Sequence, residues 1–258
     1  MNNKELKYYS NLKKKDFRDS ENKFLIEGKH LIEECLKSRY YSRNISLIII
    51  RDDFSDGILS VIKNSGIPHE KINANKFSKI SETKNSQGII AVINKISLNI
   101  RGIKEAKLIV ALDNINDPGN LGTILRTGWW FDVDKIYLSS DSVDLFNSKV
   151  IRGSQGAVFN CDIETNIDLI KKTNELYSKG WEIIAADLNT ENFLDNMDFK
   201  NYKKRMLIFG NEANGVNKHI LSESSVKKIK IRGFSECESL NVGVSAGILL
   251  SYFKNLII

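Results

Sequence analysis

The sequence is poor in cysteine and contains no long apolar run, and both absences exclude classes of protein. Its three cysteines, Cys35, Cys161 and Cys237, are odd in number, far apart and without paired spacing. This pattern argues against a disulfide framework and against a zinc site. No stretch approaches the roughly 20 uninterrupted apolar residues of a membrane helix, and the start, MNNKELKYYSNLKKK, lacks the apolar core of a secretion signal. We therefore expect a cytoplasmic globular protein that does not contact a membrane.

Several catalytic chemistries also lack their usual residues. The three histidines, His30, His69 and His219, are isolated from any serine or cysteine motif, so a nucleophilic triad has no support. No cluster of metal ligands is present. The chain contains neither the phosphate-binding pattern Gly-x-x-x-x-Gly-Lys-Ser/Thr nor the dinucleotide pattern Gly-x-Gly-x-x-Gly.

Positive charge is concentrated in the N-terminal part of the chain. Residues 1–106 contain 20 Lys and Arg against 13 Asp and Glu, whereas the remainder contains 18 against 19. A basic region joined to a nearly neutral one suggests that the first binds a polyanion while the second does something else. A lysine-rich composition with solvated lysine faces would give the same imbalance, so charge alone leaves both interpretations open.

The pattern of apolar residues predicts two α/β parts. With 258 residues, 41% of them hydrophobic, the chain can form two cores. In the first part we expect helices at Gly28–Lys37 and Ile58–Asn64 and strands at Ile45–Ile50 and Gly88–Ile93. Residues 97–106 form a polar candidate linker. The predicted domains are therefore residues 1–96 and 107–258.

The second part alternates strands and helices more regularly. This βαβ order predicts a mostly parallel sheet with helices on both faces, and ligands bind such sheets beyond the carboxyl ends of the strands. The expected strands are Lys107–Leu112, Lys135–Leu138, Val158–Cys161, Trp181–Ala186, Met206–Phe209 and Val226–Ile231. The expected helices are about Asn120–Phe131, Asn147–Arg152, Asp168–Ser178 and a last one from about Leu240.

Polar, glycine-containing segments follow three of these strands. The first, NINDPGNLGTILRT, places the amide of Asn120 and the guanidinium of Arg126 near one helix start, and core packing requires neither. The second, GNEANG, carries Glu212 in a loop whose main-chain groups can face a ligand, although a plain strand-to-helix turn would look the same. The third, IRGFSECESLNVGVSAG, contains Ser239 and Asn241 as candidate helix caps, and by itself fits a capped, tightly packed helix equally well.

Taken together, the order and spacing of these segments resemble the three motifs of the SpoU, or TrmH-like, RNA ribose methyltransferases of the SPOUT superfamily. The similarity extends from about Leu108 to the C-terminus. The segment Asn22–Gly28 resembles the start of the RNA-binding domain often fused ahead of it, which is related to ribosomal proteins. The resemblance implies a deep trefoil knot in the C-terminal part, a homodimer, and no metal. It also implies methylation of a 2′-hydroxyl in structured RNA by S-adenosylmethionine, with ribosomal RNA favoured over transfer RNA.

The resemblance also implies which residues form the site. Asn120, Arg126, Glu212 and Asn241 match the polar active-site positions, and the cofactor would be bound chiefly through the main chain near Gly210, Ile231 and Leu240, with Ala186 as a further candidate. Arg126 would stabilise the developing alkoxide, reaching across a dimer interface, because arginine is a poor base. Asn120 would orient Arg126 or the substrate, Glu212 would fix its loop, and Asn241 would hold the site by hydrogen bonding.

Two features depart from the family pattern or extend it. Members usually carry Ile-Pro where this chain has Ile231-Arg232, so the loop loses the fixed φ of proline and gains a cation. The bulky run Trp129-Trp130-Phe131 predicts packing in the core or in a dimer. Two other functions are compatible with parts of the pattern: a catalytically silent RNA-binding or ribosome-assembly factor on the same scaffold, and an unrelated nucleotide-dependent enzyme such as a dehydrogenase.

Overall fold

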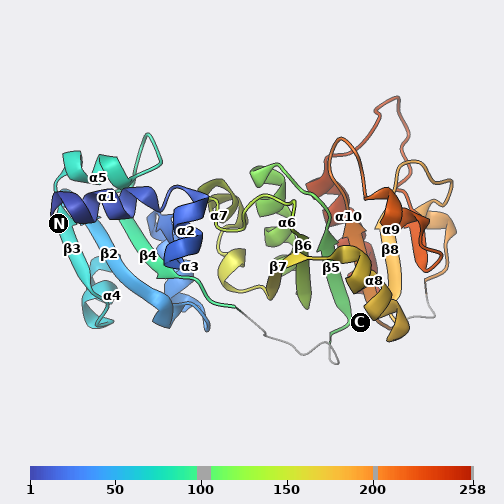
Figure 1. Cartoon of the computed structure of the whole chain (residues 1–258), viewed down its shortest axis with the longest axis horizontal. Coiled ribbons are helices and arrows are strands. Elements are labelled where there is room, and N and C mark those ends of the chain that lie inside the picture. The colour runs from blue at the N-terminus through green and yellow to red at the C-terminus, as the bar shows by residue number, and fades with distance from the viewer. Residues whose placement is uncertain (98–105, 200–202, 257–258) are drawn as a thin grey trace. The chain divides into compact units, whose positions relative to one another are not determined.

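The computed structural model describes residues 1–97, 106–199 and 203–256 (Figure 1). Contacts within the chain divide it into two compact units. The first comprises Met1–Ser97 and Phe146–Asn160, and the second the described part of Leu98–Leu145 and Cys161–Ile258. Of the candidate linker 97–106, residues 98–105 lie outside the described residues. The segment Phe146–Asn160 packs with the first unit, although the boundary at residue 107 places it in the second part of the sequence.

The first unit contains a four-stranded sheet in the order β1-β4-β2-β3. β1 and β2 are antiparallel to β4, and β3 is parallel to β2. The central strand β4 reads IIAVIN and is almost entirely buried, as expected for a strand covered on both faces. The strands are β1 (Lys23–Glu27), β2 (Ile45–Arg51), β3 (His69–Ile72) and β4 (Ile89–Asn94). The helices are α1 (Asn3–Asn11), α2 (Lys15–Glu21), α3 (Lys29–Lys37), α4 (Ile58–Asn64), α5 (Ala74–Ile80) and α7 (Ser148–Ser154), with 3-10 turns η1 (Ser42–Asn44) and η2 (Ala157–Phe159).

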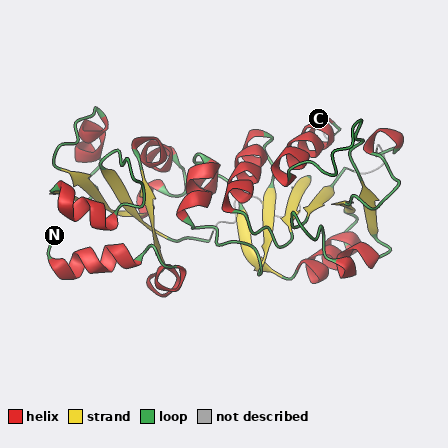
Figure 2. Cartoon of the chain, turned by 90° about the horizontal axis from the view of Figure 1, so that it is seen from above, coloured by secondary structure: helices red, strands yellow, loops and turns green. Residues whose placement is uncertain are grey.

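The second unit contains a six-stranded sheet in the order β10-β8-β9-β5-β6-β7, and every neighbouring pair is parallel. Helices cover both faces of this sheet (Figure 2), so the expected α/β fold with a parallel sheet is confirmed. The strands are β5 (Leu108–Leu112), β6 (Lys135–Ser139), β7 (Ile163–Ile167), β8 (Glu182–Ala186), β9 (Arg205–Phe209) and β10 (Val226–Ile229). The helices are α6 (Pro118–Trp130), α8 (Leu169–Ser178), α9 (Lys218–Ser222) and α10 (Val242–Asn255), with the 3-10 turn η3 (Leu194–Asn196).

The two central strands show the continuous apolar pattern that predicts a parallel sheet. β5 reads LIVAL and β9 reads RMLIF, and every residue of both is buried. Parallel strands with helices on both faces give such continuous apolar runs instead of alternation. The one charged residue of these two strands is Arg205. Its positive charge is balanced by Glu182 of the neighbouring strand, whose carboxylate accepts a hydrogen bond from Arg205 Nε at 2.9 Å.

The predicted strand Val158–Cys161 is wrong. The apolar residues there form the 3-10 turn η2, and the edge strand is instead β7, whose residues are half-buried or exposed. The chain turns just before η2 because Gln155 and Gly156 both have positive φ, 50° and 100°. The apolar run is buried within the first unit, where the Phe159 carbonyl accepts a hydrogen bond from Ser38 Oγ at 2.7 Å.

Among the helices that the structure describes, none has the length and apolar character needed to cross a bilayer.

Candidate functional site

The polar loops of the second unit meet at one edge of its sheet. β10, β8, β9 and β5 are consecutive and parallel, so their carboxyl ends lie side by side. Ala186 ends β8, Gly210 follows β9, and Ile231 lies just beyond β10. This is the edge at which open parallel sheets bind ligands.

Three of the predicted polar residues form a hydrogen-bonded group at this edge. Asn120 Nδ2 donates to Glu212 Oε1 at 2.5 Å, and Asn241 Nδ2 donates to Asn120 Oδ1 at 2.8 Å. The three side chains come from α6, from the loop after β9 and from the start of α10. Asn120 lies 92 positions from Glu212 and 121 positions from Asn241 in the sequence. The hydrogen bonds join the three side chains into one polar group, which we call the Asn-Glu-Asn cluster.

The start of α6 fixes the position of Asn120. The helix begins at Pro118, two residues earlier than predicted, with Asp117 as its N-cap. Asp117 Oδ1 accepts the main-chain N–H of Asn120 at 2.8 Å, and proline is well suited to the first helical position. The Asp-Pro-Gly sequence therefore caps a helix and presents the Asn120 amide from its first turn.

The loop after β9 is closed so tightly that it requires glycine at its first position. A Cβ placed on Gly210 would lie 2.1 Å from the carbonyl carbon of Gly215. The main chains of Asn211 and Gly215 exchange two hydrogen bonds, of 3.0 and 2.9 Å. The side chain of Asn211 ties this loop to the one after β5, since its Nδ2 donates to the Asn114 carbonyl at 2.9 Å. Glu212 is thus carried by a rigid turn.

Asn241 has two functions in the structure. Its Oδ1 accepts main-chain N–H groups of Gly243 and Val244 at 2.8 and 3.4 Å, which makes it the N-cap of α10, while its Nδ2 bonds to Asn120. α10 and α6 pack closely at this point: a Cβ on Gly243 would lie 3.0 Å from Thr123 Cγ2. Of the two candidate caps, Asn241 and not Ser239 is the one used.

Sequence reasoning missed two residues that position these loops, Asp113 and Asn211. Asp113 follows β5 and is buried, and its Oδ2 accepts the main-chain N–H of Asn217 at 2.6 Å. Burial raises the pKa of Asp113 above its ordinary value, and the Asn217 hydrogen bond opposes part of that rise. The position of Asp113, directly after a buried strand, could have indicated its role. A polar side chain that is buried there needs a hydrogen-bond partner.

Arg126 does not join the Asn-Glu-Asn cluster within one chain. It is exposed on α6, and its side chain makes no hydrogen bond or ion pair with another described residue. It shares this helix with Trp129 and Trp130, whose exposed fractions are 39% and 84%. Of the two predicted alternatives, packing in the core does not hold for Trp130, and packing in a dimer stays a prediction.

The candidate cofactor residues present main-chain groups at the same edge. Gly210 is buried, Ile231 and Ala186 are half-buried, and Leu240 is exposed. Beyond the strand ladders, no hydrogen bond among the described residues involves the main chain of Gly210, Ile231 or Leu240. No grouping of His, Cys, Asp and Glu in the described part of the chain could hold a metal ion.

Comparison with known proteins agrees with this geometry. The family model described as the SpoU rRNA Methylase family matches residues 107–251, which contain the whole Asn-Glu-Asn cluster. The chain belongs to the SpoU rRNA methylase family. The model of the MRM3-like substrate binding domain matches residues 3–91. Family membership excludes the unrelated dehydrogenase considered above.

Relatives of this SpoU chain are similar over nearly their full length. The 23S rRNA (guanosine(2553)-2'-O)-methyltransferase RlmP of Bacillus subtilis is 30% identical over 98% of this chain and 96% of its own. The 23S rRNA (guanosine-2'-O-)-methyltransferase RlmB of Neisseria meningitidis is 28% identical, covering 81% and 86%. Among solved structures, the AdoMet-bound rRNA methyltransferase of Sinorhizobium meliloti has a TM-score of 0.82 at 23% identity, covering 99% and 96%.

Proposed function

We propose that this protein methylates a ribose 2′-hydroxyl of structured RNA, using S-adenosylmethionine as the donor, and that its substrate is ribosomal rather than transfer RNA. The observation that carries the proposal is the Asn-Glu-Asn cluster, held together at the carboxyl edge of the parallel sheet. Membership of the SpoU family supports the reaction. The names of the Bacillus and Neisseria relatives, both 23S rRNA 2′-O-methyltransferases, support ribosomal RNA as the substrate.

The residues of the site would act chiefly by positioning. A ribose hydroxyl is a weak nucleophile, and holding two reactants in a near-attack geometry can contribute about 7–11 kcal/mol to catalysis. Asn120 and Asn241 present amides that can orient the sugar, and Glu212 keeps Asn120 in place. Arg126 would stabilise the negative charge that develops on the hydroxyl oxygen, because a guanidinium donates hydrogen bonds but is a poor base.

The cofactor site would be formed by the main chain at Gly210, Ile231 and Leu240, with Ala186 beside them. S-adenosylmethionine, when bound, supplies a methyl group activated on a sulfonium. A main-chain site for it is supported by the closed turn at Gly210 and by the unused main-chain groups described above. The structures of two members of the fold, from Sinorhizobium meliloti and Streptomyces viridochromogenes, carry AdoMet in their names.

A homodimer would complete the site. The exposed faces of α6 and α10 carry the apolar side chains of Trp129, Trp130, Val244 and Ile248, with exposed fractions between 39% and 84%. Contiguous apolar residues on a surface often mark an interface. Arg126 lies three residues before Trp129 on α6, so it would be carried into this interface and could reach the cluster of the partner.

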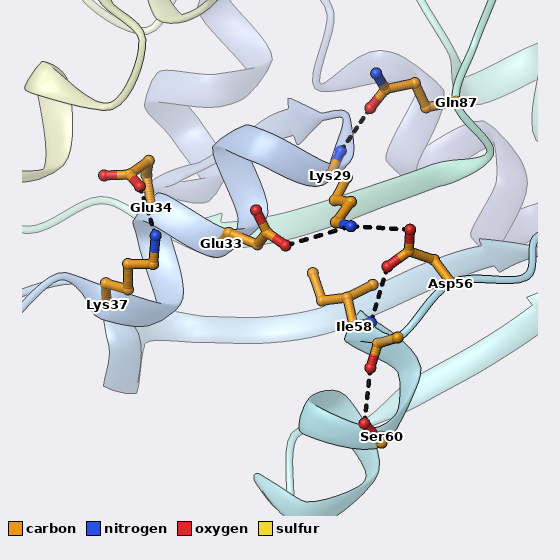
Figure 3. Close-up of polar contacts among 9 residues, drawn as sticks. Lys29, Glu33, Glu34, Lys37, Asp56, Ile58, Ser60 and Gln87 are labelled. Atoms are coloured by element: carbon orange, nitrogen blue, oxygen red, sulfur yellow. Dashed lines mark hydrogen bonds and ion pairs between the residues drawn. The ribbon is translucent and has the colours of Figure 1, made fainter.

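The two parts of the chain would divide the work. Residues 1–96 would bind RNA and residues 107–258 would transfer the methyl group, which the matches to a substrate-binding domain and to the methylase family support. Two lysines of the first unit are already paired with acids: Lys29 with Asp56 at 2.9 Å and Lys37 with Glu34 at 3.0 Å (Figure 3). A trefoil knot in the second part, a ribosomal-protein-like first domain and a cytoplasmic location complete the proposal.

Mass spectrometry of RNA tests this function. Ribose-methylated fragments are compared between cells with and without the protein, and one 2′-O-methyl group in ribosomal RNA is expected to disappear. Unchanged ribosomal RNA with a loss in transfer RNA would overturn the substrate. The silent RNA-binding factor is tested separately by titration calorimetry with S-adenosylmethionine, which such a factor would not bind.

A further inference from the structure

A short segment before β9 lies beside the end of β10. The main chain of Leu194 donates to the Lys230 carbonyl at 3.0 Å, and Lys230 donates to the Asn192 carbonyl at 2.9 Å. Phe193 and Lys230 are bridged in parallel. The residues around Phe193 therefore continue the sheet by one step at the point where the chain leaves β10 for the predicted cofactor loop.

Arg232 is attached to this segment in two ways. Its Nε and Nη2 donate to the two carboxylate oxygens of Asp195, at 2.9 and 3.2 Å, and its guanidinium lies 4.0 Å from the centre of the Phe193 ring. A two-pronged pair to a carboxylate together with stacking on an aromatic face fixes both the direction and the plane of the guanidinium. The same hydrogen bonds hold the pKa of Asp195 below its ordinary value.

Arg232 is the first residue of a loop that has few other attachments. Residues 233–241 are all exposed. Within the described residues, the hydrogen bonds of 233–240 are local contacts such as Cys237 N–H to Ser235 Oγ at 3.4 Å. At its far end the loop is fixed by Asn241, through Asn120 and the start of α10. The loop is therefore held at both ends, by Arg232 and by Asn241.

We propose that Asp195 and Phe193 are positioning residues, which hold Arg232 and thereby keep residues 233–241 in the conformation that receives the methyl donor. The proposal rests on the proposed function and adds to it a residue pair outside the Asn-Glu-Asn cluster. A loop that is already ordered loses less conformational entropy when it binds, so the pair raises cofactor affinity without touching the cofactor. Proline, whose ring fixes φ, would achieve a similar restriction by covalent means.

The test uses the full-length protein with Asp195→Asn, Arg232→Asp and the charge-exchanged double variant Asp195→Arg/Arg232→Asp. Affinity for S-adenosylhomocysteine is measured by calorimetry. Asp195→Asn is expected to weaken binding about fivefold, the upper range for a partly exposed ion pair. The charge exchange should recover part of the loss, because it restores the ion pair but not the stacking on Phe193. Glu191→Gln, which removes the neighbouring 3.6 Å pair with Lys230, is the matched control and should bind like the wild type.

A second readout does not depend on the cofactor. Phe234 is 93% exposed at the start of the loop, so chymotrypsin cleavage after it reports how freely the loop moves. Cleavage of the unliganded protein should be several times faster in Asp195→Asn than in the wild type and in Glu191→Gln. In the charge-exchanged double variant it should be slower than in Asp195→Asn. Phe193→Leu keeps an apolar side chain but removes the stacking, and it replaces Asp195→Asn if that variant does not fold.

The outcomes separate the two proposals. Equal affinity and equal cleavage in Asp195→Asn and wild type would overturn the positioning role and leave the enzyme function intact. A wild-type protein that does not bind S-adenosylhomocysteine would overturn the proposed function, while a difference in cleavage would still support the attachment of the loop. Loss of affinity in the charge exchange as large as in Arg232→Asp would also count against the role.

Discussion

Arg126 differs from the other polar residues of the site because its side chain makes no hydrogen bond or ion pair with another described residue. Arg126→Ala is expected to lower kcat by about 100-fold or more, since that is the usual effect of removing one group that stabilises developing charge. Cofactor affinity should change less than twofold, because the cofactor residues lie on other loops. Transfer of labelled methyl groups to RNA and calorimetry measure the two effects.

Two further variants control for charge alone in the Arg126 experiment. Lys171→Ala removes a cation whose side chain is 86% exposed on α8, and it should leave turnover unchanged. Arg126→Lys keeps the charge but loses the planar fork of donors, so we expect an intermediate rate. Full turnover in Arg126→Ala would remove this residue from the mechanism.

Gly210 is required by geometry rather than by chemistry. A Cβ at this position would overlap main-chain atoms of Gly215 and Val216 at 2.1 Å, and a backbone cannot move away as a flexible side chain can. Gly210→Ala should therefore lower the free energy of unfolding by about 2 kcal/mol or more, within the range for overpacking. Urea denaturation measures this change. Gly233→Ala, which meets no atom within 4 Å, should change it by less than about 0.5 kcal/mol, and equal effects of the two would contradict the explanation.

Much of the polar site was predictable at this scale, because its residues lie in the segments that connect a strand to the next helix or in the start of that helix. The resemblance of three segments to the family motifs identified Asn120, Glu212 and Asn241, and parallel strands bring such segments to one edge. Asp195 was not identified, since its contact with Arg232 joins residues 37 positions apart and depends on a bridge between Phe193 and Lys230. No local pattern reports a contact of that kind.

At the scale of elements, Glu27 joins the end of β1 to the loop that precedes β4. Its carboxylate accepts hydrogen bonds from Ser81 Oγ at 2.6 Å, Thr83 Oγ1 at 2.5 Å and the Glu82 main-chain N–H at 3.0 Å. Burial raises the pKa of Glu27, but these hydrogen bonds together lower it by more than burial raises it. The pKa of Glu27 is therefore below its ordinary value of 4.5. The folded protein therefore favours the ionised form.

This pKa predicts a stability difference that depends on pH. Glu27→Gln should destabilise the protein by about 1.5–3 kcal/mol at pH 7, the range for hydrogen bonds to a charged group. A depressed folded-state pKa means that the stabilisation is complete above the unfolded value of 4.5 and is lost as pH falls through the folded value. Denaturation at pH 7 and pH 3 checks this. A gap of the same size at both pH values would contradict it, and Glu82→Gln, an exposed side chain on the same loop, is the control.

Strong apolar runs were predicted better than charged helices. The buried strands β5 and β9 stand out as continuous apolar segments. α1 was missed because Leu6 is its only buried residue, so it has little apolar periodicity. Its start nevertheless carried a signal, the reciprocal bonds between Asn2 and Glu5 that form a capping box. The error at Val158–Cys161 came from taking a short apolar run as a strand, because periodicity alone cannot distinguish a strand from a buried helical segment in so short a run.

At the scale of the whole molecule, the exposed apolar residues of α6 and α10 predict a dimer. Trp130 is 84% exposed, and a carboxylate in its place would be buried without a partner if the face is an interface. Trp130→Glu should therefore shift the protein from dimer to monomer in sedimentation experiments at micromolar concentration. Tyr177→Glu, a 52% exposed aromatic on α8, should leave the dimer unchanged. A wild-type protein that sediments as a monomer would contradict the prediction.

If Arg126 acts on the Asn-Glu-Asn cluster of the partner, two inactive variants should restore each other. Arg126→Ala and Asn120→Ala are expected to be nearly inactive alone. After equimolar subunit exchange, about half of the dimers are mixed, and each mixed dimer has one site with Asn120 from one protomer and Arg126 from the other. Methyl transfer should return to about a quarter of the wild-type rate, since half of the dimers then carry one intact site of two. If Arg126 instead served the cluster of its own chain, both sites of the mixed dimer would lack a residue, and no activity would return.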